Sequence, residues 1–335
     1  MQIIFLRDIF SLQGGGIHKN LFLIEVFLMK LSLVVPCFNE EENITAFFDA
    51  CRAAFDTRDF DYEIVFVDDG SADKTWKIIC GLCKGSKKVK GISFSRNFGK
   101  EAAMYAGINE SRGEYTATID ADMQQRPESV VKMLEFLENN TEYDAVTLFQ
   151  TKRCEGRFIT MCKKWFYRSA NVCLGVRLKA GASDFRMLRR TAADAFLTMP
   201  EHMRFSKGIF PWLGFKTFYM PYAAEPRSGG KSSWSFFKLL RYAASGFVSF
   251  SYLPLRIISV LGAALLLCSA AALVYMLFSR RTLVSGAGLA FFAFLMSGTQ
   301  LGALGIIGEY IAQISTESKK RPLYIIRERA GDKLS

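Results

Sequence analysis

The sequence predicts an α/β domain with a mostly parallel sheet, followed by two long apolar helices. Three observations support this fold class. Short apolar runs alternate with amphipathic runs of helix length from residue 31 to about 150, half of the 335 residues are hydrophobic, and two uncharged stretches follow residue 256. Such alternation is typical of βαβ units, which bury a parallel sheet between helices.

Polar clusters follow the first four expected strands. We expect strands at 31–36, 63–67, 91–94, 115–119 and 145–149, with helices near 41–55, 72–84, 99–110 and 128–139. The clusters read PCFNE, DDGS, SRNFGK and DAD. Each one alone also fits a helix cap or a tight turn. Because ligands of open parallel sheets bind beyond the carboxyl ends of the strands, four clusters in succession favour a binding site.

The fourth cluster contains candidate metal ligands, Asp120, Asp122 and Gln124. In an extended segment their side chains point the same way and present oxygens to one hard cation, Mg²⁺ or Mn²⁺. Such a cation would neutralise a diphosphate leaving group. The alternative interpretation is an acidic pair in a solvated turn.

Positive charge is concentrated in the second half of the chain. The formal net charge is +11, and residues 150–190 hold eleven basic residues against two acidic ones. Such a block is either a solvated face or a surface for nucleic acid, anionic lipid or a phosphorylated substrate. The apolar stretches favour the last two and argue against nucleic acid. The eight scattered cysteines indicate reduced thiols, and Cys80 and Cys83 fall on an expected helix.

The uncharged stretches, 257–278 and about 286–308, are long enough to be membrane spans. Basic flanks then predict an integral protein of the cytoplasmic membrane, with the catalytic domain and both termini cytoplasmic. The expected organisation is an N-terminal extension at 1–28, which an over-long start would explain, a catalytic domain at 29–230, amphipathic juxtamembrane helices at 231–256, a two-helix transmembrane hairpin at 257–312 and a basic tail at 313–335.

Several motifs together carry a family resemblance: SLVVPCFNEEENI, VFVDDGSADKTW, SRNFGKEAAMYAGI, DADMQQRPE, SDFRMLRR and PLRIISVLG. From about residue 31 to 329 the chain resembles the polyprenyl-phosphate glycosyltransferases of glycosyltransferase family 2, which include dolichyl-phosphate mannose synthases and bacterial undecaprenyl-phosphate glucosyltransferases. The resemblance implies a GT-A fold and inverting, metal-dependent transfer from a nucleotide-sugar to a polyprenyl phosphate. UDP-glucose is the favoured donor on the analogy of the bacterial relatives.

The resemblance also implies residue roles. The nucleotide would contact Pro36, Phe38, Glu40, Asp68, Asp69 and Asp120; the metal would bind Asp120, Asp122 and Gln124; Asp184 and Asp122 would be catalytic; and Arg153, Arg186 and Lys231 would bind the acceptor phosphate. Three positions depart from the family pattern. Phe38 stands where Tyr is usual, Gln125-Arg126 replaces Asp or His followed by Pro, and Ser233 stands where Lys is usual.

The expected chemistry needs no strong base, because a phosphate monoester is largely dianionic near neutral pH. Asp184 is therefore expected to orient the acceptor rather than to remove a proton. Two other functions remain open. One is a processive polysaccharide synthase, which is disfavoured because two spans are too few for a chain-conducting pore and a Gln-x-x-Arg-Trp element is absent. The other is a non-catalytic membrane sensor or scaffold. A homo-oligomer is compatible with the glycine-rich second stretch.

Overall fold

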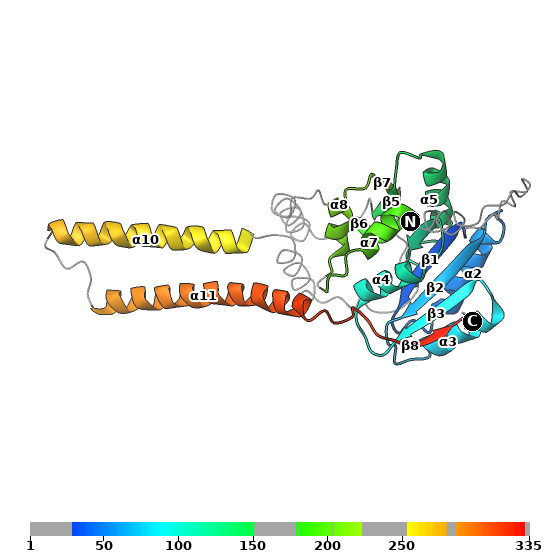
Figure 1. Ribbon diagram of the computed structural model, residues 1–335, viewed down its shortest axis with the longest axis horizontal. Coiled ribbons are helices and arrows are strands. Elements are labelled where there is room, and N and C mark those ends of the chain that lie inside the picture. The colour runs from blue at the N-terminus through cyan, green and yellow to red at the C-terminus, as the bar shows by residue number, and fades with distance from the viewer. Residues whose placement is uncertain are drawn as a thin grey trace, which may run out of the picture.

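The computed structural model describes residues 29–150, 179, 181–202, 204–222, 253–279 and 286–331. An eight-stranded sheet with the order β7-β5-β6-β4-β1-β2-β3-β8 forms the centre of the domain (Figure 1). Its strands are β1 (Leu31–Cys37), β2 (Tyr62–Asp68), β3 (Val89–Phe94), β4 (Tyr115–Thr118), β5 (Ala145–Gln150), β6 (Ala182–Arg189), β7 (Thr217–Tyr222) and β8 (Ile326–Ala330). β6 and β8 pair antiparallel with their neighbours, and the other pairings are parallel.

Helices connect the strands as the alternation predicts. They are α2 (Ile44–Phe55), α3 (Thr75–Gly85), α4 (Lys100–Glu110), α5 (Glu128–Asn139), α7 (Arg190–Leu197) and α8 (Ser206–Trp212). α2 buries Ile44, Phe47, Cys51 and Phe55 at the helical spacing that places them on one face. They join β1 and β2 in the largest hydrophobic cluster. The α/β fold is therefore confirmed, with a mixed sheet whose strands β4, β1, β2 and β3 pair parallel.

Strand β6 differs from the expectation for the basic segment. Its residues, ASDFRMLR, were expected on a charged face, but β6 lies inside the sheet between β4 and β5. Arg186 is 4% exposed. Arg189 donates to the carbonyl oxygens of Leu137 and Tyr143 and to the hydroxyl of Tyr115. A basic strand is buried here because its guanidinium groups find acceptors inside the domain.

The end of the chain returns to the sheet, where only a basic tail was expected. β8 pairs antiparallel with β3 (Figure 1). Arg329 makes a two-pronged ion pair with Glu110 of α4, at 2.7 and 2.8 Å, and Trp76 of α3 donates to Glu328 at 2.7 Å. Tyr324 stacks on Phe94 with ring centroids 5.0 Å apart. The last strand thus covers the edge that β3 would otherwise expose.

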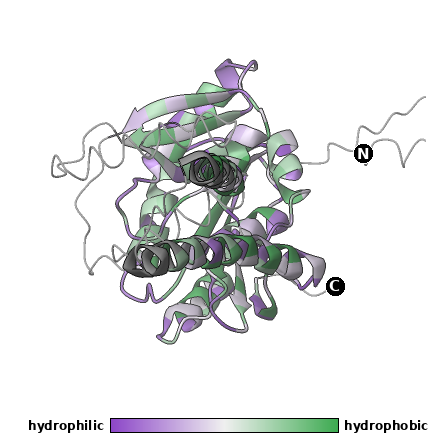
Figure 2. Ribbon diagram, turned by 90° about the vertical axis from the view of Figure 1, so that its left-hand side faces the viewer, coloured by the Kyte–Doolittle hydropathy of each residue, from purple (hydrophilic) through white to green (hydrophobic). Residues whose placement is uncertain are grey.

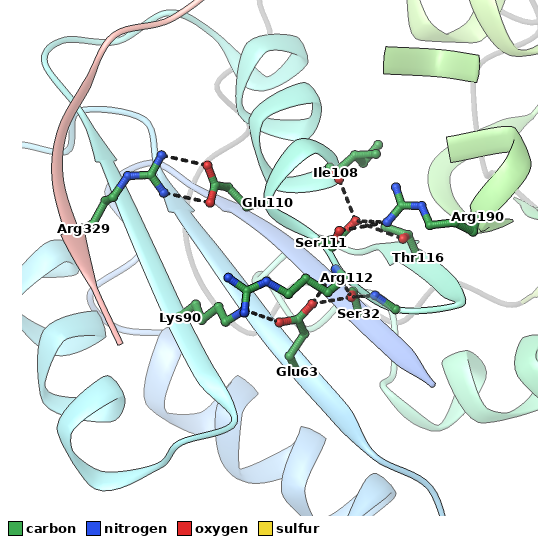
Figure 3. Close-up of polar contacts among 11 residues, drawn as sticks. Ser32, Glu63, Lys90, Ile108, Glu110, Ser111, Arg112, Thr116, Arg190 and Arg329 are labelled. Carbon is green, nitrogen blue, oxygen red and sulfur yellow. Dashed lines mark hydrogen bonds and ion pairs between the residues drawn. The ribbon is translucent and has the colours of Figure 1, made fainter. Parts of the chain in front are cut away.

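A buried polar network ties the amino ends of the parallel strands together (Figure 3). Glu63, 1% exposed, accepts from the Ser32 hydroxyl at 2.6 Å and from the Arg112 backbone N–H at 2.7 Å. Its second oxygen pairs with the Lys90 ammonium at 2.7 Å. Ser32 in turn accepts from the Gly113 N–H at 2.7 Å. These residues come from β1, β2, β3 and the turn before β4, so one carboxylate joins four chain segments.

Two long helices, α10 (Leu253–Ser279) and α11 (Gly286–Ser318), extend from the same side of the domain (Figure 1), and the view in Figure 2 shows that they lie at an angle to each other. Among the described residues, however, no helix is long and apolar enough to cross a membrane. The predicted transmembrane hairpin is therefore wrong, and the integral-membrane localisation is corrected with it. The prediction had rested on the uncharged length of 257–278 and about 286–308.

Two predicted regions lie wholly or mostly outside the described residues. They are the extension at 1–28 and the amphipathic region at 231–256, of which only the last four residues are described, as the start of α10. The domain boundaries drawn there stay predictions.

Candidate active site

The loops after β1 and β2 are bonded to each other at the carboxyl edge of the sheet. The Asn39 N–H donates to the Ser71 hydroxyl and the Asn39 side chain accepts from the Ala72 N–H, both at 2.9 Å. The Glu40 N–H donates to the Thr75 hydroxyl at 2.8 Å. Gly70, with φ +69°, approaches the backbone of Arg96 so closely that a Cβ would lie 2.5 Å from its carbonyl carbon. The first three polar clusters therefore form one rim.

The residues expected to contact the nucleotide divide into two groups. Phe38 is 47% exposed at the rim, with Pro36 and Glu40 partly buried beside it. Asp68 and Asp69 are buried, at 1% and 3% exposed. Asp68 accepts from the Ser71 N–H at 3.0 Å and the Ser93 hydroxyl at 2.7 Å. In this structure both acids organise loops, and Phe38 offers an aromatic surface.

Asp69 holds the loop that leads into α4. Its carboxylate accepts from the Phe98 N–H at 2.7 Å and from the Gly99 N–H at 2.9 Å. Gly99 has φ +98°, a conformation that favours glycine, and Lys100 follows as the first residue of α4. Burial raises the pKa of Asp69 to about 6, against the two backbone hydrogen bonds that lower it. A buried acid from β2 thus fixes the place of Lys100.

The candidate metal ligands lie in a turn rather than in an extended segment. β4 ends at Thr118, and Met123 has φ +57°, so the chain reverses after Asp122. The Gln124 N–H donates back to the Asp122 carboxylate at 3.2 Å. The expectation of simple alternation along a strand is therefore wrong, although the three residues do share one short loop.

Asp184 reaches the same rim from β6. Because β6 is antiparallel to β4, its beginning lies beside the end of β4, and the Thr118 hydroxyl donates to the Asp184 carbonyl oxygen at 2.7 Å. The Lys100 ammonium lies 2.6 Å from one Asp120 oxygen and 2.8 Å from the other, and 3.5 Å from Asp184 Oδ2. The structure therefore brings two predicted acids together around a lysine that the sequence analysis gave no role.

Electrostatics keeps Asp184 and Lys100 ionised. Burial acts to raise the pKa of Asp184, but Lys100, Lys207 and Arg186 together hold it below its ordinary value. Burial likewise acts to lower the pKa of Lys100, and the charges of Asp120 and Asp184 outweigh it and raise that pKa. Asp184 Oδ1 is buried and has no hydrogen-bond partner among the described residues. Lys100 and Asp184 therefore stand at this rim as oppositely charged groups.

The cations assigned to the acceptor phosphate are less accessible. Arg153 and Lys231 lie outside the described residues. Arg186 stacks on the Phe210 ring at 3.8 Å and donates to the Ser183 carbonyl oxygen at 3.3 Å. Two other cations, Arg126 and Lys132, line a cavity of about 280 Å³ beside Gln124, together with Ser129 and Tyr222. Sequence reasoning missed this cavity, because its walls come from α5, β5 and β7.

The ligand types at the rim suit a hard divalent cation. Asp120, Asp122 and Gln124 supply carboxylate and amide oxygens, and Mg²⁺ in phosphate-handling sites commonly takes one or two carboxylates plus substrate oxygens. Asp184 Oδ1 is a further buried oxygen at the same rim. In the described part of the chain, no group of three or more His, Cys, Asp or Glu residues is arranged to hold a metal ion.

Comparison with known proteins assigns the family. Residues 32–197 match the model of glycosyl transferase family 2. CsbB of Bacillus subtilis (strain 168), a glycosyltransferase by name, is 38% identical over 89% of this chain and 91% of its own length. The prophage bactoprenol glucosyl transferase homolog of Escherichia coli (strain K12) is 35% identical over 89% of this chain and 99% of its own. The bactoprenol glucosyl transferase of Shigella phage SfV is 35% identical over 89% of this chain and 98% of its own length.

The chain therefore belongs to glycosyl transferase family 2, and it is a glycosyltransferase, as the motifs indicated. Among solved structures, the glucosyl-3-phosphoglycerate synthase of Mycobacterium tuberculosis, crystallised with Mn²⁺ and UDP, gives a TM-score of 0.49 at 16% identity, over 70% of this chain and 84% of that one. At that level of likeness it supports no statement about ligands.

Proposed function

We propose that the protein transfers glucose from UDP-glucose to a polyprenyl phosphate, with inversion at the anomeric carbon. The observation that carries the proposal is the cluster of Asp120, Asp184 and Lys100, which lies at the same carboxyl edge of the sheet as the exposed Phe38, where parallel sheets bind ligands. The bactoprenol glucosyl transferases named above support the choice of sugar and acceptor, since their similarity extends over about nine-tenths of this chain.

In the proposed reaction, an oxygen of the acceptor phosphate attacks the anomeric carbon and forms the new carbon–oxygen bond. The bond from that carbon to the β-phosphate oxygen breaks, and the nucleoside diphosphate leaves with the electron pair. No proton transfer is needed, because the acceptor is largely dianionic. Asp184, kept ionised by its cationic neighbours, is suited to orient cationic groups beside the acceptor.

A divalent metal, Mg²⁺ or Mn²⁺, when bound by Asp120, Asp122 and Gln124, would offset the charge of the diphosphate. Phe38 would lie against the base of the nucleotide. The lysine and arginine residues expected at the acceptor, Arg153, Arg186 and Lys231, stay predictions, as does association of the chain into a homo-oligomer.

The test is a transfer assay with the full-length chain, labelled UDP-glucose and undecaprenyl phosphate. We expect a labelled lipid and an equal amount of UDP only when both substrates and a divalent metal are present, and NMR should identify the product as the β anomer. UDP release without acceptor would contradict the proposal. Incorporation of many sugars per chain would indicate a processive synthase, and binding without turnover would indicate a sensor.

A further inference from the structure

Lys100 is the best candidate for an unassigned role at this site. Its ammonium contacts both oxygens of Asp120, at 2.6 and 2.8 Å, and lies 3.5 Å from Asp184. Because Asp120 is a candidate metal ligand, a cation of this protein already holds the carboxylate that a metal would need. Lys100, Asp120 and Asp184 side chains are 40%, 31% and 27% exposed, so solvent and ligands reach the cluster.

The position of Lys100 is built into the fold. Asp69 of β2 accepts from the two N–H groups just before it, and Gly99 has the positive φ that starts the helix there. On the other side, Glu101 accepts from the Ser206 N–H at 3.2 Å. The backbone of Lys100 is thus held from both sides. Its side chain is long and flexible, so the ammonium is free to change partners while the helix stays in place.

We infer that the Lys100 ammonium is an internal counter-ion that competes with the metal for Asp120, and that arrival of the diphosphate moves it from the carboxylate to the phosphate oxygens. This inference rests on the proposed function, since it needs a nucleoside diphosphate and a metal at the rim. The result is an ordered assembly: the metal binds weakly alone and tightly together with the nucleotide, with Lys100 as a positioning residue.

Charge balance supports this order. With Lys100 on Asp120, a divalent cation entering alone would meet an ammonium within contact distance of its ligand. A diphosphate brings negative charge that accepts both the cation and the ammonium, and hydrogen bonds from an ammonium to phosphate are charge-assisted and strong. Coupling between two ligands is reciprocal, so the metal should strengthen nucleotide binding by the same factor as the nucleotide strengthens metal binding.

The test is a titration of the full-length protein with Mn²⁺, followed by the electron paramagnetic resonance signal of free Mn²⁺, with and without UDP. In the wild type we expect UDP to increase the affinity for Mn²⁺ by about tenfold or more, within the usual range of coupling between sites. Lys100→Met should bind Mn²⁺ about tenfold more tightly without UDP and lose most of the UDP effect. Lys100→Arg keeps the charge and should behave like the wild type.

Lys88→Met is the matched control, because Lys88 pairs with Asp56 at 3.1 Å away from the rim and should leave both titrations unchanged. Circular dichroism spectra confirm that each variant is folded, and Lys100→Gln replaces Lys100→Met if the latter is not. Unchanged or weaker Mn²⁺ binding by the charge-removing variant would overturn the inference, as would a wild type that binds no Mn²⁺. The transfer assay is independent: a wild type that shows the Lys100 effect but makes no lipid product would contradict only the proposed function.

Discussion

The two ends of the sheet hold lysine–carboxylate pairs of opposite character. At the amino end, Glu63 is 1% exposed; one of its oxygens accepts from Ser32 and Arg112, and the other forms an ion pair with Lys90 (Figure 3). At the carboxyl end, the side chains of Lys100 and Asp120 are 40% and 31% exposed. The enclosed pair stabilises the fold, whereas the partly exposed pair can be reached by ligands.

The largest effect should follow from removing the accessible carboxylate. Asp120→Asn should lower transfer by about 10²–10³-fold, the scale seen when one electrostatic contact to a reacting group is lost. Its free energy of unfolding should change by less than about 1 kcal/mol, because exposed ion pairs contribute little. Turnover and urea denaturation of the same preparations measure the two effects. If Asp120→Asn were strongly destabilised while its folded fraction kept full turnover, the roles assigned to the two ends of the sheet would be reversed.

The amino-end pair should show the opposite result. Glu63→Ala leaves Lys90 and the Arg112 N–H without their acceptor, and breaking a buried pair typically costs about 3–5 kcal/mol of unfolding free energy. Turnover per folded molecule should stay near the wild-type value. The double variant Glu63→Gln with Lys90→Met removes both charges and should recover part of the loss. Equal losses in the single and double variants would show that the charges are not coupled.

The free energy of unfolding of the wild type should depend on pH through Asp69, and the Asp69→Asn variant should lack this dependence. The folded pKa of Asp69, about 6, lies above the ordinary value of an unfolded aspartate, about 3.9. The folded state therefore binds this proton more tightly, and the contribution of Asp69 to stability falls as pH rises from about 4 to 6. Relative to Asp69→Asn, the wild type should lose about 2–3 kcal/mol over that range. A pH-independent difference between their urea curves would refute this.

The smallest effect is expected at the ion pair between β8 and α4. Glu110 and Arg329 are 20% and 44% exposed, so the pair is more accessible than Glu63–Lys90 despite its two short contacts. A double-mutant cycle with Glu110→Gln and Arg329→Met should give a coupling energy of about 0.5–1 kcal/mol. A coupling above about 3 kcal/mol would mean that exposure does not separate strong pairs from weak ones in this domain.

The regular part of the fold was predictable because its signals are local. Strands β1 to β5 and helices α2 to α5 lie close to the ranges that the alternation predicts. β6 and β8 were missed because their charged residues, such as Arg189 and Glu328, find partners only after distant segments meet. The predicted transmembrane hairpin was wrong: in the described part of the chain, no helix is long and apolar enough to cross a membrane.

The acids of the candidate site could be named from the sequence, but the lysine beside them could not. Asp120, Asp122 and Asp184 belong to motifs that can be recognised in the sequence. Lys100 belongs to one of the polar clusters, yet its partners come from other segments, just after β4 and near the beginning of β6. The available signal was a lysine directly after a glycine, at the first turn of a helix on the ligand-binding edge.

The strand β8 has a consequence for biosynthesis. Trp76 and Glu328 are 252 positions apart, so the edge next to β3 is closed only after both long helices have been made. Until then, a nascent chain leaving the ribosome carries an open strand edge, which is prone to pair with other chains. Shortening the chain before residue 326 should therefore favour aggregation during expression even where the rim residues are intact.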